Sequence, residues 1–316
     1  MIISASRRTD IPAYYADWFI NRIKEGKVQV RNPMNTHQIS EIDLNPDVVD
    51  CIVFWSKNPL GIIDKLGELK SYNYYFQFTL NGYDKDVELN LPDKGTLIKL
   101  FKNLSDKIGK EKVVWRYDPI LINSKYTREY HIQNFKEIAG SLKGYTQRAV
   151  ISFVDMYAKT KRNTANLGIE DISENDMHEI AAKLSAISKE MNMDIYSCAE
   201  SIDLSADGIE HGCCIDKNLI EEITGINLKC GKDKNQREVC GCFESIDVGT
   251  YNTCKNGCRY CYATYDDYAV DENIKLYNPN SLLLCSEIKP SDKIYPKKIK
   301  SLKDDTGELQ GQLSML

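Results

Sequence analysis

The chain has 316 residues, of which 42% are hydrophobic and 28% charged, and its formal net charge at pH 7 is −5. This composition predicts a globular protein with one large domain and appendages, or with two modest domains. No stretch approaches the roughly 18 apolar residues of a membrane span, and the first ten residues do not resemble a signal peptide, so we expect a soluble, unprocessed, cytoplasmic protein. The acidic balance excludes a general attraction to nucleic acid, although residues 293–303 are locally basic.

Six short apolar segments recur along residues 1–226, and an amphipathic stretch follows each of them. The apolar segments are rich in aromatic and β-branched residues without polar alternation, which is typical of parallel strands covered on both faces. Six strand–helix units predict an α/β fold, a (βα)6 partial TIM-type barrel. We expect the strands at 2–10, 51–59, 74–83, 113–120, 149–157 and 194–201, and the helices near 13–25, 59–70, 95–109, 127–143, 173–192 and 216–224, the fifth helix being capped by Ser173.

Each of the six segments starts apolar and ends polar. In a βα barrel the carboxyl ends of the strands surround one mouth, where active sites are built. A single polar strand end is more often merely solvated than functional, but six that converge predict a site. The candidate catalytic residues are Arg7, Arg8, Asp10, Lys57, Asn81, Arg116, Asp118, Asp155 and Glu200, and Thr79 and Ser152 are candidate cofactor-binding residues. An arginine pair at this mouth suits a carboxylate or phosphate group.

Nine of the eleven cysteines fall between Cys198 and Cys261, which favours metal binding over disulfides in a chain without an export signal. Cys254, Cys258 and Cys261 form a C-x3-C-x2-C pattern, whose three thiolates suit three corners of a [4Fe–4S] cluster and leave the fourth iron open. Gly257 permits the sharp turn that this loop needs. Zinc normally takes four ligands, and chance placement of core cysteines is the remaining alternative.

A second set of cysteines has no such compact spacing. Its members are Cys198, Cys214, Cys240 and Cys242, with Cys213 and Cys230 nearby, whereas Cys51 and Cys285 lie in apolar runs typical of core residues. Four thiolates would close a metal site completely. We interpret the set first as an auxiliary [4Fe–4S] cluster, with structural zinc or unligated thiols as the alternatives.

The C-x3-C-x2-C pattern, with Tyr260 just before its last cysteine, resembles the cluster-binding motif of the radical S-adenosylmethionine (SAM) superfamily. The resemblance implies that SAM chelates the open iron and that one electron, from a reductant such as flavodoxin or ferredoxin, yields a 5′-deoxyadenosyl radical that abstracts hydrogen from substrate. It also makes Tyr260 a candidate cofactor-binding residue.

The wider pattern of ISASRRTDIP, FWSKNP, FTLNGY, RYDPI and KDKNQR-x2-CGC-x2-SID-x-G-x-Y-x-TC resembles the DUF1848 family over nearly the whole chain. FTLNG and RYDPI are also similar to the spore photoproduct lyase group. Radical SAM barrels carry the cysteine loop directly after their first strand, but here it follows the sixth unit. If residues 243–254 supply the preceding strand, the barrel is circularly permuted, with residues 2–10 next to that strand. No Gly-Gly-Glu is present where a SAM-contacting motif is expected.

We divide the chain into the barrel (1–226), a cysteine-rich segment packing on its mouth (227–296) and a tail (297–316). The tail ends in Gln312–Leu316, QLSML, which resembles the bacterial sliding-clamp-binding motif but has Met-Leu in place of the usual Leu-Phe. The alternative is that the tail docks on its own domain.

The hypotheses are thus a radical SAM enzyme acting on a nucleic-acid base or DNA lesion, one acting on a small molecule or peptide, and a non-catalytic iron–sulfur or zinc protein.

Overall fold

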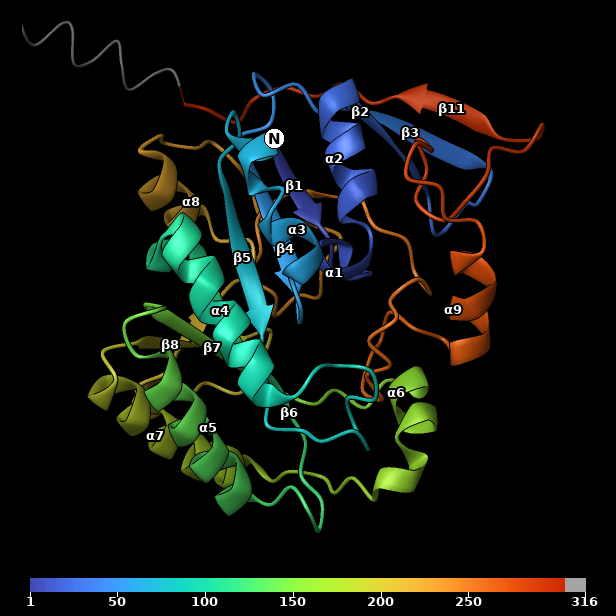
Figure 1. Cartoon of the computed structure of the whole chain (residues 1–316). Helices are drawn as coiled ribbons and strands as arrows, with labels where there is room; N and C mark the ends of the chain where they lie inside the picture. Colours follow the sequence, from blue (N-terminus) through green and yellow to red (C-terminus); the bar gives the residue numbers. More distant parts are fainter. Residues whose placement is uncertain (305–316) are drawn as a thin grey trace, which may run out of the picture.

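The computed structural model describes residues 1–304, whose main sheet has eight strands in the order β10-β1-β4-β5-β6-β7-β8-β9 (Figure 1). Every neighbouring pair of strands in this sheet is parallel. The strands are β1 (Ile2–Ala5), β4 (Cys51–Ser56), β5 (Tyr74–Thr79), β6 (Val113–Ile120), β7 (Arg148–Phe153), β8 (Asp194–Cys198), β9 (Glu210–Gly212) and β10 (Ile246–Asp247). The six strands expected from the apolar segments are confirmed.

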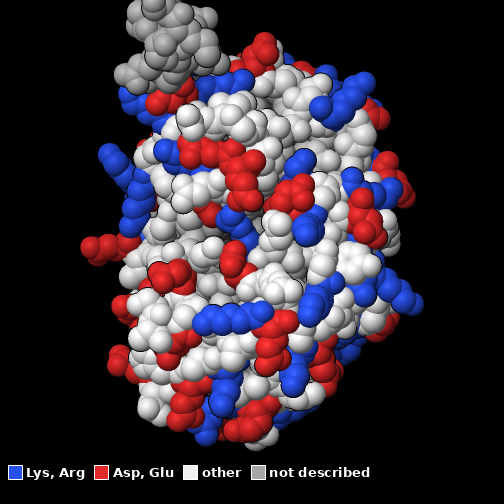
Figure 2. Space-filling view, turned by 90° about the vertical axis from the view of Figure 1, so that its left-hand side faces the viewer, with Lys and Arg blue, Asp and Glu red and all other residues white. Residues whose placement is uncertain are grey.

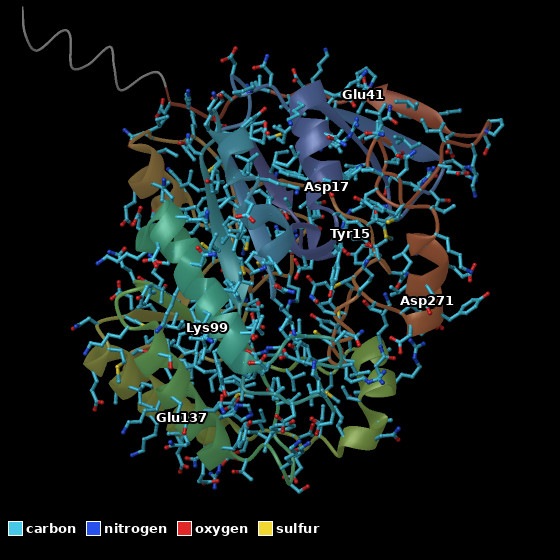
Figure 3. All side chains as sticks on the ribbon, in the orientation of Figure 1. Tyr15, Asp17, Glu41, Lys99, Glu137 and Asp271 are labelled. Atoms are coloured by element: carbon cyan, nitrogen blue, oxygen red, sulfur yellow. The ribbon has the colours of Figure 1, made fainter. Side chains whose placement is uncertain are left out.

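Helices follow the strands as the amphipathic stretches predict. They are α1 (Ile11–Tyr14), α2 (Ala16–Glu25), α3 (Leu60–Ile63), α4 (Lys94–Ile108), α5 (Arg128–Leu142), α7 (Glu174–Glu190) and α8 (Lys217–Thr224). Side-chain caps fix several starts: Asp93 accepts the backbone N–H of Thr96, and Ser173 accepts that of Asp176, as expected. Lys99 on α4 and Glu137 on α5 are exposed, on the side of these helices away from the sheet (Figure 3).

The two faces of the main sheet bury different residues, because successive side chains of a strand point to opposite sides. One face packs on α2, α4, α5 and α7 through residues such as Phe54, Phe76 and Trp115, and the Trp115 ring stacks on Phe135 of α5 at 4.6 Å. The opposite face, called the inner face here, carries Ile2, Val53, Tyr75, Val114 and Val150. Residues of α8 and of the cysteine-bearing loops near it cover this face, so one of the six predicted helices lies on the inner face and the other five pack on the opposite face.

The sheet is not closed into a barrel, which corrects the expected partial TIM-type barrel. Within residues 1–304 no ladder joins the edge strands β9 and β10. Residues 239–247 connect the two edges instead: the Val239 carbonyl contacts His211 of β9 at 2.8 Å, Phe243 N donates to the Ile215 carbonyl, and β10 then pairs with β1. Strand β10 therefore lies beside β1, as the permuted order predicts.

A small second sheet was not expected from the sequence. It contains β2 (Lys27–Arg31) and β3 (Gln38–Asp43), which are antiparallel, and β11 (Lys293–Pro296), which is parallel to β3. Helices α6 (Ala158–Asn163) and α9 (Asp267–Ile274) were also not predicted, and both lie near the cysteine loop (Figure 1). None of the helices within residues 1–304 has the length and apolarity to cross a membrane.

Candidate functional site

Asp247, the last residue of β10, fixes the start of the cysteine loop at the carboxyl edge of the sheet. Its carboxylate accepts hydrogen bonds from Ser4 Oγ at 2.7 Å and Ser6 Oγ at 2.6 Å, and from the backbone N–H groups of Arg7 and Gly249. Three of these donors, from Ser4, Ser6 and Arg7, belong to β1 and to the turn after it, so one carboxylate joins the first strand to the strand that precedes the loop. Sequence reasoning missed this residue.

The turn between the first two cysteines of the loop depends on a glycine. Gly257 has φ of +66°, a left-handed conformation, and a Cβ at this position would lie 2.9 Å from Asn90 Nδ2. After the turn, Cys261 N donates to the Cys258 carbonyl at 3.1 Å. The tight loop that the C-x3-C-x2-C spacing requires is therefore present.

Asp10 holds the loop against the end of β4 and the start of α1. Its carboxylate accepts from Ser56 Oγ at 2.7 Å, Lys57 N at 2.9 Å, Ala13 N at 3.0 Å and Asn256 Nδ2 at 3.0 Å. Burial raises the pKa of Asp10, and these hydrogen bonds act in the opposite direction. Asp10, a candidate catalytic residue, is thus buried beneath the loop and fully engaged in hydrogen bonds.

Two tyrosines at the junction of α1 and α2 reinforce this anchoring. The Tyr14 hydroxyl donates to Asn256 Oδ1 at 2.7 Å, and the Tyr15 hydroxyl donates to the Thr253 carbonyl at 2.5 Å. Tyr15 is 1% exposed and points toward the interior (Figure 3). Tyrosine hydroxyls therefore hold Thr253, just before Cys254, and Asn256, just before Gly257.

Glu88 organises a buried charged cluster beside the loop. It accepts from Lys57 Nζ at 2.9 Å, Lys94 Nζ at 2.6 Å and the Tyr260 hydroxyl at 2.5 Å, and it forms a backbone bridge with Cys258. Burial opposes ionisation of Glu88, but the charges of Lys57 and Lys94 outweigh it and hold its pKa at about 2. Lys57 therefore lies next to the loop, as predicted. Glu88, which sequence reasoning missed, joins it to Tyr260 within the loop.

The pKa values of two thiols of the loop, Cys254 and Cys258, are raised. Burial raises the pKa of Cys254 to about 12, and the neighbouring Asp10 and Cys261 act in the same direction. Burial also raises the pKa of Cys258 well above its usual value, and only the Lys57 ammonium opposes this. Metal binding would have to release these protons, because the thiolate is the ligand.

Three half-buried thiols on one turn fit three corners of a [4Fe–4S] cluster, since each thiolate of such a cluster binds a different iron. Within residues 1–304 no three His, Cys, Asp or Glu side chains are grouped closely enough to surround a single metal ion.

The cysteines of the second predicted set also come together, on the inner face of the sheet. The Sγ atoms of Cys198 and Cys214 are 3.0 Å apart, and the Cys242 thiol is hydrogen-bonded to both Cys214 and Cys240. All four are at least 92% buried. Cys213 and Cys230 are less buried, and neither contacts this chain of sulfur atoms by a hydrogen bond within the described part of the molecule.

A path of polar contacts leads from the second set to the cysteine loop. Arg116 Nη1 lies 2.9 Å from Cys214 Sγ, and its Nη2 forms an ion pair with Asp118. The Asp118 backbone exchanges two hydrogen bonds of 2.8 Å with the side chain of Asn81, whose Nδ2 also lies 3.2 Å from the Tyr260 hydroxyl. Ser152 Oγ donates to Asp118 at 3.0 Å. Four of the residues predicted at the ends of β5, β6 and β7 therefore form one network: Asn81, Arg116, Asp118 and Ser152.

The two arginines after β1 have different surroundings. The Arg7 guanidinium lies over the Trp55 ring at 5.4 Å, donates to Ser245 Oγ at 3.2 Å and is within electrostatic reach of Cys242 and Cys214. Arg8 lies over the Tyr251 ring at 5.1 Å and 3.8 Å from Asp247. Both are at the carboxyl edge, where the sequence predicted them.

Three other predicted residues lie apart from this network. Glu200, after β8, accepts from Phe153 N at 2.9 Å, and burial raises its pKa to about 7. Asp155, after β7, forms an ion pair of 2.6 Å with Arg237 of the cysteine-rich segment. Thr79 ends β5 opposite Arg116 in the ladder, with its side chain half-buried. All three are at the carboxyl edge, but within residues 1–304 none touches the cysteine loop by a hydrogen bond.

Comparison with known proteins assigns the chain to a family. No curated protein matches the chain at a significant level. A candidate alpha-L-fucosidase from Bacteroides thetaiotaomicron, known from its crystal structure, is 10% identical over 72% of this chain and 86% of that chain, with a TM-score of 0.26, which is too low to support any conclusion. The model of the family described as "Domain of unknown function (DUF1848)" matches residues 2–263. This match confirms the resemblance seen in the sequence, and the chain belongs to the DUF1848 family.

Proposed function

We propose that the chain is a radical SAM enzyme whose [4Fe–4S] cluster is bound by Cys254, Cys258 and Cys261. The observation that carries the proposal is the position of the loop. It leaves β10 at the carboxyl edge of a parallel sheet, and β1 is the next strand of that sheet. In the sheet the loop follows β10, the first strand of the series β10-β1-β4-β5. The cysteine loop of radical SAM proteins likewise follows their first strand. In the sequence, however, the loop comes after all the strands of this sheet. A circularly permuted, open relative of the radical SAM barrel accounts for this order.

The chain itself supplies the surroundings that such a cluster needs. When bound, the cluster and SAM would supply one-electron cleavage of the sulfonium and a radical that abstracts hydrogen. Lys57 places a buried positive charge beside Cys258, which favours the thiolate form there. Glu88 keeps Lys57 charged, and Tyr260 fixes both of them by hydrogen bonds. Asp10 and Asn256 set the backbone of the turn, so that its shape does not depend on the metal alone.

SAM turnover under anaerobic conditions tests the proposal. After reconstitution with iron and sulfide, the protein with dithionite and SAM is expected to produce 5′-deoxyadenosine, and Cys258→Ala is expected to abolish it, because all three thiolates are needed to hold the cluster. Cys51→Ala is the matched control, since Cys51 is buried in β4 and hydrogen-bonds only to a backbone carbonyl within the described chain. Equal 5′-deoxyadenosine formation by wild type and Cys258→Ala would refute the enzyme proposal and leave a non-catalytic iron–sulfur or zinc protein.

For the substrate we propose a nucleic-acid base or lesion, and the rim of the site supports this. The Tyr251 ring lies between Arg8 at 5.1 Å and Lys159 of α6 at 5.7 Å, and Arg162 of α6 lies over the Tyr265 ring at 4.0 Å. Cations interleaved with aromatic rings suit a stacked base and its phosphate. Figure 2 shows basic and acidic side chains interspersed over another face, so contact with a polyanion would have to be local.

Binding of a single-stranded oligonucleotide tests the substrate class separately. Replacing Lys159 and Arg162 together by Gln is expected to weaken binding by about tenfold and to lower its salt dependence, because two phosphate contacts are removed. Lys99→Gln on the outer side of α4 is the matched control and should bind like wild type (Figure 3). Equal binding by both variants, or none by wild type at low salt, would favour a small molecule or peptide as the substrate.

A further inference from the structure

Four buried thiols meet on the inner face of the main sheet, and the cluster proposed above does not use them. Cys198 ends β8, Cys214 lies in the loop between β9 and α8, and Cys240 and Cys242 belong to the segment that crosses from β9 to β10. Three separate parts of the chain thus deliver sulfur atoms to one place. All four cysteines are free of disulfide bonds.

The sulfur atoms form a continuous series of contacts. Cys198 and Cys214 are 3.0 Å apart at Sγ, Cys214 contacts Cys242, and Cys242 contacts Cys240. Ile215 N also points at Cys242 Sγ, at 3.5 Å. Backbone N–H groups directed at sulfur are a usual feature of thiolate ligands in metal sites.

Positive charge next to these sulfurs argues against four neutral core thiols. Arg116 Nη1 lies 2.9 Å from Cys214 Sγ, although the side chain of Arg116 is 7% exposed and already has one carboxylate partner in Asp118. The Arg7 guanidinium is close enough to Cys242 and Cys214 to interact with both electrostatically. A buried guanidinium needs negative partners, and thiolates bound to metal would provide them. A metal dication or a [4Fe–4S]²⁺ core with four thiolates carries two negative charges, which two guanidinium groups can balance.

We propose that Cys198, Cys214, Cys240 and Cys242 bind a second metal centre, ligated by four thiolates and separate from the centre at Cys254, Cys258 and Cys261. The ligand is a thiophilic metal centre, either a [4Fe–4S] cluster or a zinc ion, since both accept four cysteines. Four ligands leave no open position, so this centre holds structure or carries electrons and does not activate a substrate.

As they stand, the four thiols do not surround a single metal ion within the described residues. Binding of zinc therefore requires a small outward movement of the sulfurs, and binding of a cluster, in which each thiolate holds a different iron, requires a larger one. Tetrahedral bonds of about 2.3 Å place neighbouring sulfurs about 3.8 Å apart, whereas Cys198 and Cys214 are 3.0 Å apart. This pair of sulfur atoms is closer than ordinary van der Waals contact, so the two atoms have to move apart. The centre would then join the β8–β9 edge of the sheet to the segment that leads to β10, so that it connects the two edges where no strand ladder does.

Metal analysis of a protein that lacks the first centre tests this inference independently of SAM chemistry. The variant with Cys254→Ala, Cys258→Ala and Cys261→Ala is reconstituted anaerobically with iron, sulfide and zinc. It is expected to retain about four irons, or about one zinc, per chain. Iron would identify the cluster, and zinc would identify the structural ion. Less than a tenth of either amount would overturn the inference, whatever the outcome of the SAM assay.

A matched pair of serine variants then locates the metal. Added to the triple variant, Cys240→Ser is expected to remove the remaining metal, whereas Cys213→Ser, next to Cys214 in the chain but outside the sulfur contacts, should keep it. X-ray absorption at the edge of the retained metal decides the case if Cys240→Ser fails to fold. A first shell made only of sulfur is expected, and a shell containing nitrogen or oxygen would contradict the proposal.

Discussion

Gly257 shows how much the cysteine loop depends on a single residue. Its φ of +66° is unfavourable for any residue with a Cβ, and an added methyl would press on Asn90, whose side chain holds the Lys255 carbonyl at 2.8 Å. We expect Gly257→Ala to lower the free energy of unfolding by about 1–2 kcal/mol. We also expect it to reduce the iron retained after desalting. Urea denaturation and iron analysis measure the two effects.

Gly67→Ala is the control for this substitution. Gly67 lies in a short 3-10 helix, has no positive φ, and nothing lies within 4 Å of an added Cβ. Its replacement should leave iron content unchanged and stability equal or slightly higher. If both variants kept their iron equally well, the turn at Gly257 would not matter for metal binding.

His131 provides a prediction about pH that is independent of any metal. It is 1% exposed, contacts the Leu121 carbonyl through Nε2 at 2.8 Å and the Tyr117 hydroxyl through Nδ1, and burial lowers its pKa to about 4. In the unfolded chain its pKa returns to about 6.5. The neutral ring therefore stabilises the fold above pH 6.5, by up to about 3 kcal/mol, and this contribution is lost as pH falls toward 4.

We accordingly expect His131→Gln to be less stable than wild type at pH 7, with a difference that narrows steadily toward pH 4. Urea unfolding at several pH values measures it. A difference that stays constant across this range would show that His131 does not carry the pH dependence.

The polar residues at strand ends are the part of the candidate site that the sequence predicts best. Position near the carboxyl end of a buried strand predicts Lys57, Asn81, Arg116 and Asp118, and contacts with one another and with Tyr260 join all four in one network. Glu88 was missed because it lies in a loop with no strand pattern, and only the neighbouring positive charges of Lys57 and Lys94 reveal its importance. Asn256 had a readable signal: an amide directly before the glycine of a cysteine turn is well placed to hold that turn.

At the level of elements, the sequence located strands whose burial is nearly complete. Cys51–Ser56 and Tyr74–Thr79 match their predicted positions because both are continuous runs of aromatic and β-branched residues. The hairpin of β2 and β3 was missed although KVQVR and QISEID alternate. Strand β11 (KIYP) was missed because it is short and ends in proline, and all four of its residues are exposed. Short, solvent-facing strands depend on their partners, which a local pattern does not contain.

The junction of β10 and β1 is the element on which the proposed loop geometry rests. Asp247→Ala would leave the hydroxyls of Ser4 and Ser6 and two backbone N–H groups without their acceptor, at a cost of about 2–4 kcal/mol. We expect faster hydrogen–deuterium exchange in residues 246–261, with little change in α4, α5 and α7. Exchange measured by mass spectrometry resolves these segments.

Asp292→Ala is the corresponding control at the small sheet. Asp292 accepts from Arg31 Nη2 and Lys289 N, both at 2.8 Å, and makes no contact with β10. Its loss should increase exchange in β2 and β11 only. Increased exchange over the cysteine loop in both variants would indicate general destabilisation and not a local role for Asp247.

For the whole molecule, the expected barrel was wrong in its closure and right in its strand order. Periodicity identifies strands and their parallel arrangement, but closure depends on whether the edge strands pair. Here the edge strands β9 and β10 have only three and two residues, and within residues 1–304 they do not pair with each other. Sequence alone did indicate β10 as the neighbour of β1, because the position of the cysteine motif required a strand before it.

The tail motif Gln312–Leu316 lies outside the described residues 1–304, and clamp binding stays a prediction. Near the end of the described residues the chain is anchored, since Ser301 Oγ donates to Asp50 at 2.5 Å and Lys229 N donates to the Leu302 carbonyl at 2.7 Å. Burial of Leu313, Met315 and Leu316, at about 1.5–3 kcal/mol each, only marginally offsets the ordering of the five-residue motif at about 1–2 kcal/mol per residue. Affinity for the sliding clamp should therefore be micromolar.

Deleting residues 312–316 should abolish binding to the clamp, measured by surface plasmon resonance, and leave 5′-deoxyadenosine formation unchanged. No measurable binding by the intact protein would remove this support for a DNA substrate. A deletion that unfolds the protein would show that the tail docks on its own domain.

The position of β10 beside β1 also has a consequence for biosynthesis. Translation proceeds from β1 onward, so the first strand leaves the ribosome more than two hundred residues before its partner at Ile246–Asp247. Until then β1 is an open edge of a nascent parallel sheet, and such edges invite pairing with other chains. The cysteine loop follows every strand of the main sheet in the sequence, so a metal bound there could be inserted only after these strands have been made. A chain that stops before residue 243 should therefore be recovered as aggregate and not as a soluble, metal-free form of the protein.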